Sequence, residues 1–350
     1  MKLLVVGGGA TGSVIVHLLS KSNVASRVAL SIWEKARGVG GRMSTHRFEG
    51  DALADMGAQY ITVPWNSNKP STGSSIFNES LQELLYSNIL VPFNGSIENE
   101  VSSSELQRNF VAPGGINTIV KHFINNSKAQ ISVNTKLVSL DVCKEGVKCS
   151  TDDGSEIFDG VVLTIPLPQV SALQGDLRTY LKAHEKVFSD AEYSSRYAVA
   201  FAYKQSTHLP FTWSSKYFQD DVIRYVSYEA RKRGVVETLA PVLMIHTAVP
   251  FGMHHLEDDK QEIIKTVQSR LLMLVPGLPP PVDSYCVRWR YSQVRRQVCS
   301  SNGYSIVHQN PMVVLTGDAF TYSNLEGSFK AAEATARMIE EKLTKETTKT

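Results

Sequence analysis

The sequence predicts an α/β protein in which a doubly wound sheet is joined to a second domain of mixed α and β structure. Three observations predict this fold. The chain has 350 residues, about the length of two compact domains. A strand, a glycine loop, a helix and a second strand follow one another within the first 34 residues. Short apolar runs return at 160–165 and 312–316, as expected for strands buried on both faces.

The first part of the chain holds the clearest local signals. Residues 2–6 form a short apolar run that predicts a buried strand, and 28–33 predict the next strand. Between them, 13–21 carry apolar residues at helical spacing. A polar loop is expected over 64–75, followed by an amphipathic helix over 77–86.

The rest of the chain mixes helices with short strands. The expected elements, in order, are a turn-rich segment over 94–104, a helix over 116–124, alternating strands to about 158 with a hairpin turn at 152–154, a strand over 160–165, helices over about 176–189 and 258–274, a proline-rich connector over 276–281, a strand over 312–316, and a helix over 327–343.

Composition and charge exclude several classes of protein. Hydrophobic residues make up 42% and charged residues 20%, which excludes a disordered, collagen-like or coiled-coil chain. The formal net charge is only +2, which lacks the strong positive charge typical of nucleic-acid-binding proteins. Four cysteines without a CxxC pair make neither a disulfide framework nor a zinc site. We therefore expect an intracellular protein with no metal, no nucleic-acid partner and no membrane partner.

The N-terminus imitates a secretory signal peptide, because residues 3–20 contain no Asp, Glu, Lys or Arg. However, the stretch contains four glycines, which an apolar signal core rarely tolerates, and cleavage would remove the glycine loop. A cytoplasmic location is therefore the expectation, with secretion as the alternative.

The glycine loop predicts a Rossmann-like dinucleotide site. Gly7, Gly9 and Gly12 satisfy GxGxxG between a predicted strand and a predicted helix. In this motif the first glycine permits the tight turn, the second lets the backbone approach a pyrophosphate, and the third lets the helix pack on the strand. Glu34 lies 22 residues beyond Gly12, where an acid accepts hydrogen bonds from a ribose.

A second glycine cluster favours FAD over NAD. Gly38, Gly40 and Gly41 are followed by Arg42, soon after Glu34. A second place where the main chain can approach a phosphate, together with a cation, suits a cofactor that lies extended along the domain, as FAD does.

These motifs resemble the FAD-dependent amine-oxidase superfamily. The resemblance is carried by Gly40-Gly41-Arg42-Met43, by the run from Asp55 to Ile61, and by Gly317-Asp318 ahead of a helix. Further stretches resemble one branch of it, whose members oxidise isomeric dihydronicotinamides. They include 109–116, 163–168, 193–198, 245–252 and 289–294, and the likeness runs from residue 3 to about 335.

The resemblance implies a two-domain flavoprotein that holds FAD without a covalent bond. It implies hydride transfer from 2- and 6-dihydroNAD(P) to flavin N5, giving NAD(P)+, while O2 becomes hydrogen peroxide. The implied partners are a small-molecule dinucleotide substrate and O2. Motif and resemblance together assign cofactor binding to Gly7, Gly9, Thr11, Gly12, Glu34, Gly41, Arg42, Gln59, Tyr60, Gly317 and Asp318. A thioether link to the flavin is not expected, because no cysteine follows Cys299.

Tyr60, His246 and Trp289 are the candidates for the substrate pocket, although His246 and Trp289 are equally well explained as core residues. No catalytic side chain is assigned, because no nucleophile elbow, metal cluster or acid–base pair stands out. The run 231–233 is basic and is expected to be solvated, with contact to a pyrophosphate as the alternative.

The expected FAD-binding domain comprises 1–64, 110–170 and 285–343, and the expected substrate domain comprises 65–109 and 171–284, with a frayed tail over 344–350. Two other functions remain open. One is an amine or polyamine oxidase on the same fold, and the other is a binding protein that uses the flavoprotein fold without redox chemistry. The sequence does not predict the oligomeric state or a preference between the NAD and NADP forms.

Overall fold

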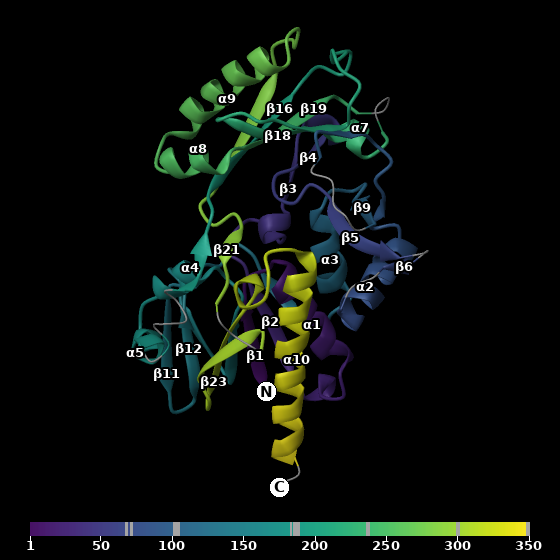
Figure 1. The fold of residues 1–350 in the computed structure, drawn as a ribbon. Helices are drawn as coiled ribbons and strands as arrows, with labels where there is room; N and C mark the ends of the chain where they lie inside the picture. Colours follow the sequence, from purple (N-terminus) through teal and green to yellow (C-terminus); the bar gives the residue numbers. More distant parts are fainter. Residues whose placement is uncertain are drawn as a thin grey trace.

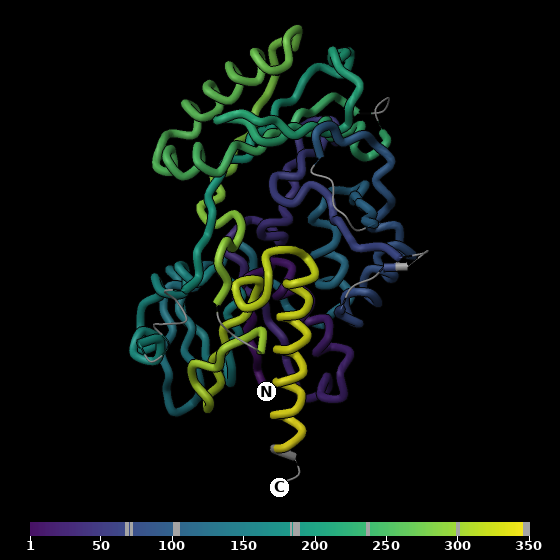
Figure 2. Tube along the Cα trace, in the orientation of Figure 1, coloured from purple at the N-terminus to yellow at the C-terminus, as the bar shows by residue number. Residues whose placement is uncertain are grey.

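The structure is a computed structural model. It describes residues 1–66, 69–70, 73–100, 106–182, 184, 190–235, 239–298 and 302–347, and the remaining residues are drawn in grey in Figure 2. Cys299, most of 183–189 and the last three residues therefore lie outside the described residues.

A six-stranded sheet with the order β10-β2-β1-β14-β23-β22 confirms the doubly wound fold. Its strands are β1 (Lys2–Val6), β2 (Ala29–Trp33), β10 (Gln130–Ser132), β14 (Gly160–Leu163), β22 (Tyr304–His308) and β23 (Met312–Thr316). All neighbouring pairs are parallel except β22 with β23. β1 lies between β2 and β14, so the strand order reverses beside β1, where such folds bind their ligands.

Alternate residues of this sheet enter two different cores, which produces three layers. Leu3, Val5 and Val162 pack with α1 (Ala10–Lys21), α3 (Asn117–Asn125) and α10 (Leu325–Thr347). Leu4, Val6 and Val161 face the opposite way. That second core includes α4 (Leu167–Ser171), α5 (Leu177–Lys182) and the three-stranded sheet of β11 (Ser139–Cys143), β12 (Gly146–Ser150) and β13 (Ser155–Phe158).

A second six-stranded sheet lies at the other end of the molecule (Figure 1). Its order is β20 (Asp283–Trp289), β16 (Arg196–Ala202), β19 (Val242–Thr247), β18 (Ile223–Tyr228), β17 (Ser215–Tyr217) and β8 (Ile97–Glu98). Helices α8 (Val249–His254) and α9 (Lys260–Leu274) cover its outer face. Its inner face packs toward β3 (Thr45–Arg47) and β4 (Leu53–Asp55).

Smaller elements complete the description. In the described residues they are β5 (Ile61–Asn66), β6 (Lys69–Pro70), α2 (Ser75–Tyr86), β7 (Val91–Pro92), β9 (Gln107–Val111), β15 (Glu192–Tyr193), α7 (Glu229–Lys232), β21 (Val294–Arg296) and the short 3-10 turns Ala25–Arg27, Gly41–Met43, Glu49–Asp51 and Asp318–Phe320. Within the described residues, no helix combines the length and apolarity needed to cross a membrane.

The structure differs from the sequence-based expectation in several places. Residues 64–66 and 69–70 are strand rather than loop, because Pro64 pairs with β9, more than 40 residues along the chain, and Trp65 and Asn66 pair with β6. α10 continues past Leu343 to Thr347, where fraying was expected. α2, which was expected in the substrate domain, packs in the same core as α1 and α10. Residues 285–289, which were expected in the FAD-binding domain, pair with β16 of the second sheet. The division into two domains stays a prediction, and these contacts suggest moving two of its boundaries.

Candidate functional site

The carboxyl ends of the parallel strands β1, β2, β14 and β23 meet at one edge of the first sheet. Gly7, Glu34, Thr164 and Gly317 are the residues that follow these strands. The Gly7 amide donates to the Trp33 carbonyl at 2.9 Å, and the Thr164 hydroxyl donates to the Gly7 carbonyl at 3.1 Å. The predicted dinucleotide residues therefore gather where the strand order reverses.

The first glycine loop is tight on one side and open on the other. A Cβ on Gly12 would lie 2.2 Å from the Gly7 carbonyl oxygen, so the first turn of α1 requires glycine there. A Cβ on Gly9 would meet nothing within 4 Å. Gly9 is also the N-cap of α1 and provides no side-chain cap, while Thr11 is buried in the first turn. The N-terminus of α1 thus faces open space, as an anion site requires.

The second glycine loop lies directly against the first. The Gly40 amide donates to the Gly8 carbonyl at 2.8 Å, and a Cβ on Gly41 would lie 3.4 Å from Gly9 Cα. The Glu34 carboxylate accepts from the Gly8 and Ala36 amides, each at 2.8 Å. Glu34 therefore holds the first loop closed from the end of β2, the position predicted for a ribose-binding acid.

Arg42 and Asp318 join the second loop to the end of β23. The two guanidinium nitrogens Nη1 and Nη2 donate to the two Asp318 carboxylate oxygens at 2.7 and 2.6 Å. Gly317, just before Asp318, has φ +135°, which favours glycine. Because arginine has five N–H donors, Arg42 can hold Asp318 and still offer donors to a phosphate. The open Gly9, the uncapped helix and Arg42 together fit the pyrophosphate of FAD.

We expect Arg42→Ala to weaken FAD binding by about 1.5–3 kcal/mol, the range for hydrogen bonds to charged groups. The substitution also leaves the Asp318 carboxylate, which is only 9% exposed, without its ion-pair partner. The measurement is a titration of the cofactor-free protein with FAD. Arg337→Ala is the control, because Arg337 pairs with Glu333 on the exposed surface of α10. Equal affinities in the two variants would contradict the assigned role of Arg42.

Tyr60, His246 and Trp289, the predicted pocket residues, gather on the inner face of the second sheet. Trp289 Nε1 donates to the Met56 carbonyl at 2.7 Å, and His246 Nε2 lies 3.4 Å from the same oxygen. The Tyr60 hydroxyl lies 2.7 Å from the Tyr217 hydroxyl.

The ring of Tyr225 bridges two of these candidates. Its centroid lies 6.5 Å from that of Tyr60 and 6.1 Å from that of His246. We call Tyr60, Tyr217, Tyr225, His246 and Trp289 the aromatic wall. Tyr217 and Tyr225 were not singled out in the sequence, where only their strand context was visible.

The imidazole of His246 is neutral at physiological pH. Burial is the largest cause and the positive charge of Arg196 is the next, and together they lower the pKa of His246 to about 3. The described residues hold no group of three or more His, Cys, Asp or Glu side chains arranged to bind a metal ion.

Gln59, a predicted FAD contact, is engaged by protein groups at both ends of its side-chain amide. Its Nε2 donates to the Asp55 carbonyl and to the Gly57 carbonyl, the latter at 2.9 Å, and its Oε1 accepts from Lys232 at 3.2 Å. The structure therefore gives Gln59 a role in holding the loop after β4, and its contact with FAD stays a prediction.

A buried ionic cluster lies behind this loop. It consists of Asp55, Glu229, Lys232 and Arg233, whose side chains are at most 1% exposed. Lys232 lies 3.1 Å from Asp55 and 2.7 Å from Glu229, and Arg233 lies 2.5 Å from Asp55 and 2.9 Å from Glu229. Although burial alone would raise the pKa of Asp55, Arg233 and Lys232 hold it below its ordinary value.

The expectation that the basic run 231–233 is solvated is therefore wrong for Lys232 and Arg233. Their i+3 and i+4 spacing from Glu229 on α7 turns both toward the same buried carboxylate. Arg231 instead donates to the Phe211 and Trp213 carbonyls at 2.8 and 3.2 Å.

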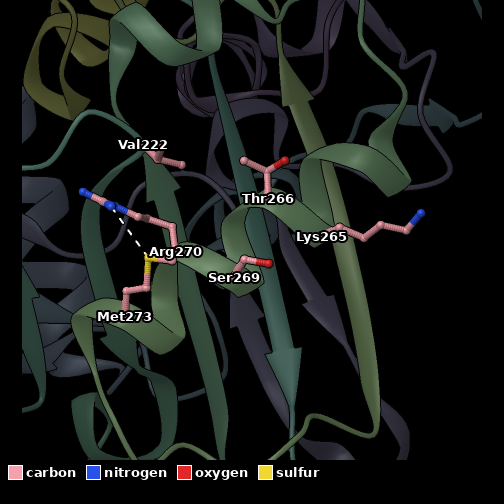
Figure 3. A pocket seen from close by; sticks show the side chains of 6 residues that line it. All are labelled: Val222, Lys265, Thr266, Ser269, Arg270 and Met273. Carbon is pink, nitrogen blue, oxygen red and sulfur yellow. Dashed lines mark hydrogen bonds between the residues drawn. The ribbon is translucent and has the colours of Figure 1, made fainter.

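A hollow on the covering helix α9 takes no part in this site. Val222, Lys265, Thr266, Ser269, Arg270 and Met273 line it, as Figure 3 shows. α9 packs on the outer face of the second sheet, whereas the aromatic wall lies on the inner face.

Comparison with known proteins agrees with this geometry. Residues 64–339 match the model of the flavin-containing amine oxidoreductases, and residues 5–72 match an NAD(P)-binding Rossmann-like domain. The chain therefore belongs to the family of flavin-containing amine oxidoreductases, and its cofactor is FAD. Within that family it is similar to renalase. The Mus musculus protein is 34% identical over 344 residues, which cover 97% of this chain and 98% of that protein.

Solved structures show the same fold at low sequence identity. A candidate protoporphyrinogen oxidase from Exiguobacterium sp. 255-15 matches with a TM-score of 0.68 and 14% identity, covering 97% of this chain and 99% of its own. Putrescine oxidase bound to putrescine matches with a TM-score of 0.64 and 14% identity, with the same coverage. Both structures cover 97% of this chain, so the fold that they share with it includes the part of mixed structure that was predicted beside the Rossmann-like part.

Proposed function

We propose that this flavin oxidoreductase takes a hydride from 2- and 6-dihydroNAD(P), the off-pathway isomers of NAD(P)H, and releases NAD(P)+. When bound, FAD supplies the hydride acceptor and passes the two electrons to O2, which becomes hydrogen peroxide. The near-full-length likeness to renalase supports this substrate class. The observation that carries the proposal is the aromatic wall, in which the rings of Tyr225 and Trp289 lie beside the neutral imidazole of His246.

The residues of the wall suit a reaction that needs orientation more than proton transfer. A dihydropyridine ring already carries a transferable hydride, so its reduced carbon needs only to be held against the acceptor. Tyr60 and Trp289 offer ring faces and edges for such a flat group. The Met56 carbonyl fixes Trp289 and His246 relative to each other, because both nitrogens approach the same oxygen.

We expect flavin reduction by 6-dihydroNAD to be independent of pH from neutral to mildly alkaline conditions. A pKa of about 3 means that His246 gains a proton only far below this range, so no titration of His246 falls within it. The measurement is the anaerobic single-turnover rate at each pH. His246→Asn should slow reduction by less than about tenfold, because the side chain positions the substrate rather than accepting a proton.

A general-base role for His246 predicts a different result. Its titration would give an inflection near neutral pH, and His246→Asn would slow reduction by about 10²-fold or more and remove the inflection. Putrescine and other simple amines serve as the substrate control. Flavin reduction by amines but not by dihydronicotinamides would replace our proposal with an amine oxidase.

A further inference from the structure

We propose that Arg196 and Arg224 form an anion subsite beside the aromatic wall, which binds the diphosphate of the dinucleotide substrate. The inference rests on the proposed function, because it assigns the part of that substrate which does not react. We call this pair of arginines the arginine pair.

Arg196 begins β16 at the edge of the aromatic wall. In the antiparallel register it lies opposite Trp289, two residues before Ala198, which lies opposite His246. Because side chains alternate along a strand, Arg196 shares the inner face of the sheet with Ala198. The backbone at this point is fixed, since a Cβ on Gly252 of α8 would lie 2.4 Å from Arg196 Cα.

Arg224 reaches the wall from β18. Its guanidinium lies 5.3 Å from the centroid of the Tyr217 ring, and the Tyr217 hydroxyl lies 2.7 Å from that of Tyr60. The register of β18 against β19 is irregular between Ile223 and Tyr225, which is where Arg224 stands. Two strands of one sheet thus bring two guanidinium groups to the same aromatic surface.

Neither guanidinium of the pair has a carboxylate partner among the described residues. Arg196 donates to the neutral Gln293 side chain at 3.0 Å, and its buried Nε has no hydrogen-bond partner. Arg224 donates to the Phe218 carbonyl at 3.1 Å. Burial lowers the pKa of Arg196, and although Tyr217 acts in the opposite direction, the positive charge of Arg224 lowers it again.

The arginine pair differs in this respect from the other cations of the site. Arg42 is neutralised by Asp318. Within the buried ionic cluster, the carboxylates of Asp55 and Glu229 neutralise Lys232 and Arg233. Cations withdrawn from water are costly unless an anion compensates them. The two residues of the arginine pair are half-buried, and no carboxylate among the described residues pairs with either of them, so the pair presents a positive charge that an anionic ligand would satisfy.

Two carboxylates on the neighbouring segment do not supply that anion. Glu98 of β8 pairs with Lys216 at 2.8 Å, and Glu100 accepts from the Asn109 amide at 3.1 Å. A dinucleotide does supply it, because its diphosphate is separated from the nicotinamide ring by a single ribose. A guanidinium fork matches two phosphate oxygens, and two arginines match two phosphates.

The test compares two substrates that share the reacting ring but differ in the diphosphate. The holoenzyme and its Arg196→Gln and Arg224→Gln variants are mixed anaerobically with 6-dihydroNAD or with the riboside of the same dihydronicotinamide. We expect each variant to bind 6-dihydroNAD about 10- to 150-fold more weakly, which corresponds to losing a charge-assisted hydrogen bond. Affinity for the riboside should change less than about twofold. Equal losses for both substrates would overturn the inference.

A matched control removes an arginine that also lies over an aromatic ring. Arg108 is exposed on β9, with its guanidinium 4.6 Å from the centroid of the Trp65 ring, and Arg108→Gln should leave both affinities unchanged. A drop in 6-dihydroNAD affinity in this control that matches the drop in the Arg196 variant would overturn the assignment to the arginine pair.

A second measurement is independent of turnover. ADP-ribose, which carries the diphosphate but no nicotinamide, is titrated into the oxidised holoenzyme and followed by calorimetry. Binding that is lost in Arg196→Gln and partly kept in Arg196→Lys supports the subsite, even if dihydronicotinamides prove not to be substrates. Unchanged ADP-ribose binding in Arg196→Gln and Arg224→Gln overturns it, even if the proposed reaction is confirmed.

Discussion

Lys232→Met is expected to lower the free energy of unfolding by about 3–5 kcal/mol, the cost of removing one partner from a buried ion pair. Methionine keeps the unbranched shape of lysine as far as Cε and lacks only the terminal ammonium group, so packing changes little. What changes is the charge balance, because Asp55 and Glu229 are left with Arg233 as their only cation within the cluster. Urea unfolding of the FAD-loaded protein at neutral pH measures the effect.

The control substitution removes a lysine from an ion pair of the same spacing that is exposed to solvent. Lys265 pairs with Glu262 at the same i,i+3 spacing, but the two side chains are 70% and 66% exposed. Lys265→Met should therefore lower the free energy of unfolding far less than Lys232→Met does. Equal small losses in the two variants would show that the buried cluster contributes no net stability.

The pH at which these variants are compared matters. The folded state lowers the pKa of Asp55, so the stability from its charge is present above the ordinary pKa of about 3.9. That stability is lost as the pH falls through the lower, folded-state pKa. At neutral pH the whole contribution of Asp55 is therefore available to be measured.

The buried ionic cluster also connects the region of the first sheet to the aromatic wall on the second sheet. The Asp55 carboxylate accepts from the Ile116 amide at 2.8 Å, just before α3, which packs on the first sheet, and it pairs with Lys232 of α7 beside the second sheet. Met56 follows Asp55 and offers its carbonyl to Trp289 and His246. A change in the cluster should therefore loosen the aromatic wall as well as lower stability.

The glycine loop and the acid at the carboxyl edge of the first sheet could be predicted because their sequence signals are local. Gly7, Gly9 and Gly12 lie in six consecutive residues, and a strand and a helix flank them. Glu34 is one strand further along the chain. Backbone conformation and close approach decide these positions, and both follow from neighbouring residues.

The aromatic wall and the ionic cluster depend on contacts that no local pattern records. Lys232 and Asp55 are 177 residues apart in the chain, so a basic run beside a short helix resembled a solvated surface. Nor did local patterning indicate that Arg196 and Arg224 would share one face of a sheet. β16 and β18 are not even neighbours, since β19 lies between them. The resemblance to a family made Tyr60, His246 and Trp289 candidates for the substrate pocket, which stays a prediction, but it did not indicate the groups that hold them.

The second large effect is expected from Gly9→Ala, which should separate cofactor binding from folding. A Cβ on Gly9 meets no protein atom within 4 Å, so the cofactor-free protein should fold with a free energy of unfolding within about 1 kcal/mol of the original. The same methyl group would intrude where a pyrophosphate approaches the backbone at the N-terminus of α1. Crowding of this kind costs about 1–3 kcal/mol, so FAD should bind about 5- to 150-fold more weakly.

Two further alanine variants make the result specific to the cofactor. Gly12→Ala places a methyl group 2.2 Å from the Gly7 carbonyl oxygen, so it should destabilise the cofactor-free protein as well. Gly154→Ala adds a methyl group in open space at the hairpin between β12 and β13, and FAD affinity should not change. FAD titration and urea unfolding of all three variants provide the comparison. If Gly9→Ala bound FAD as tightly as Gly154→Ala, the glycine loop would be only a tight turn, and the phosphate would have to lie elsewhere along the sheet edge.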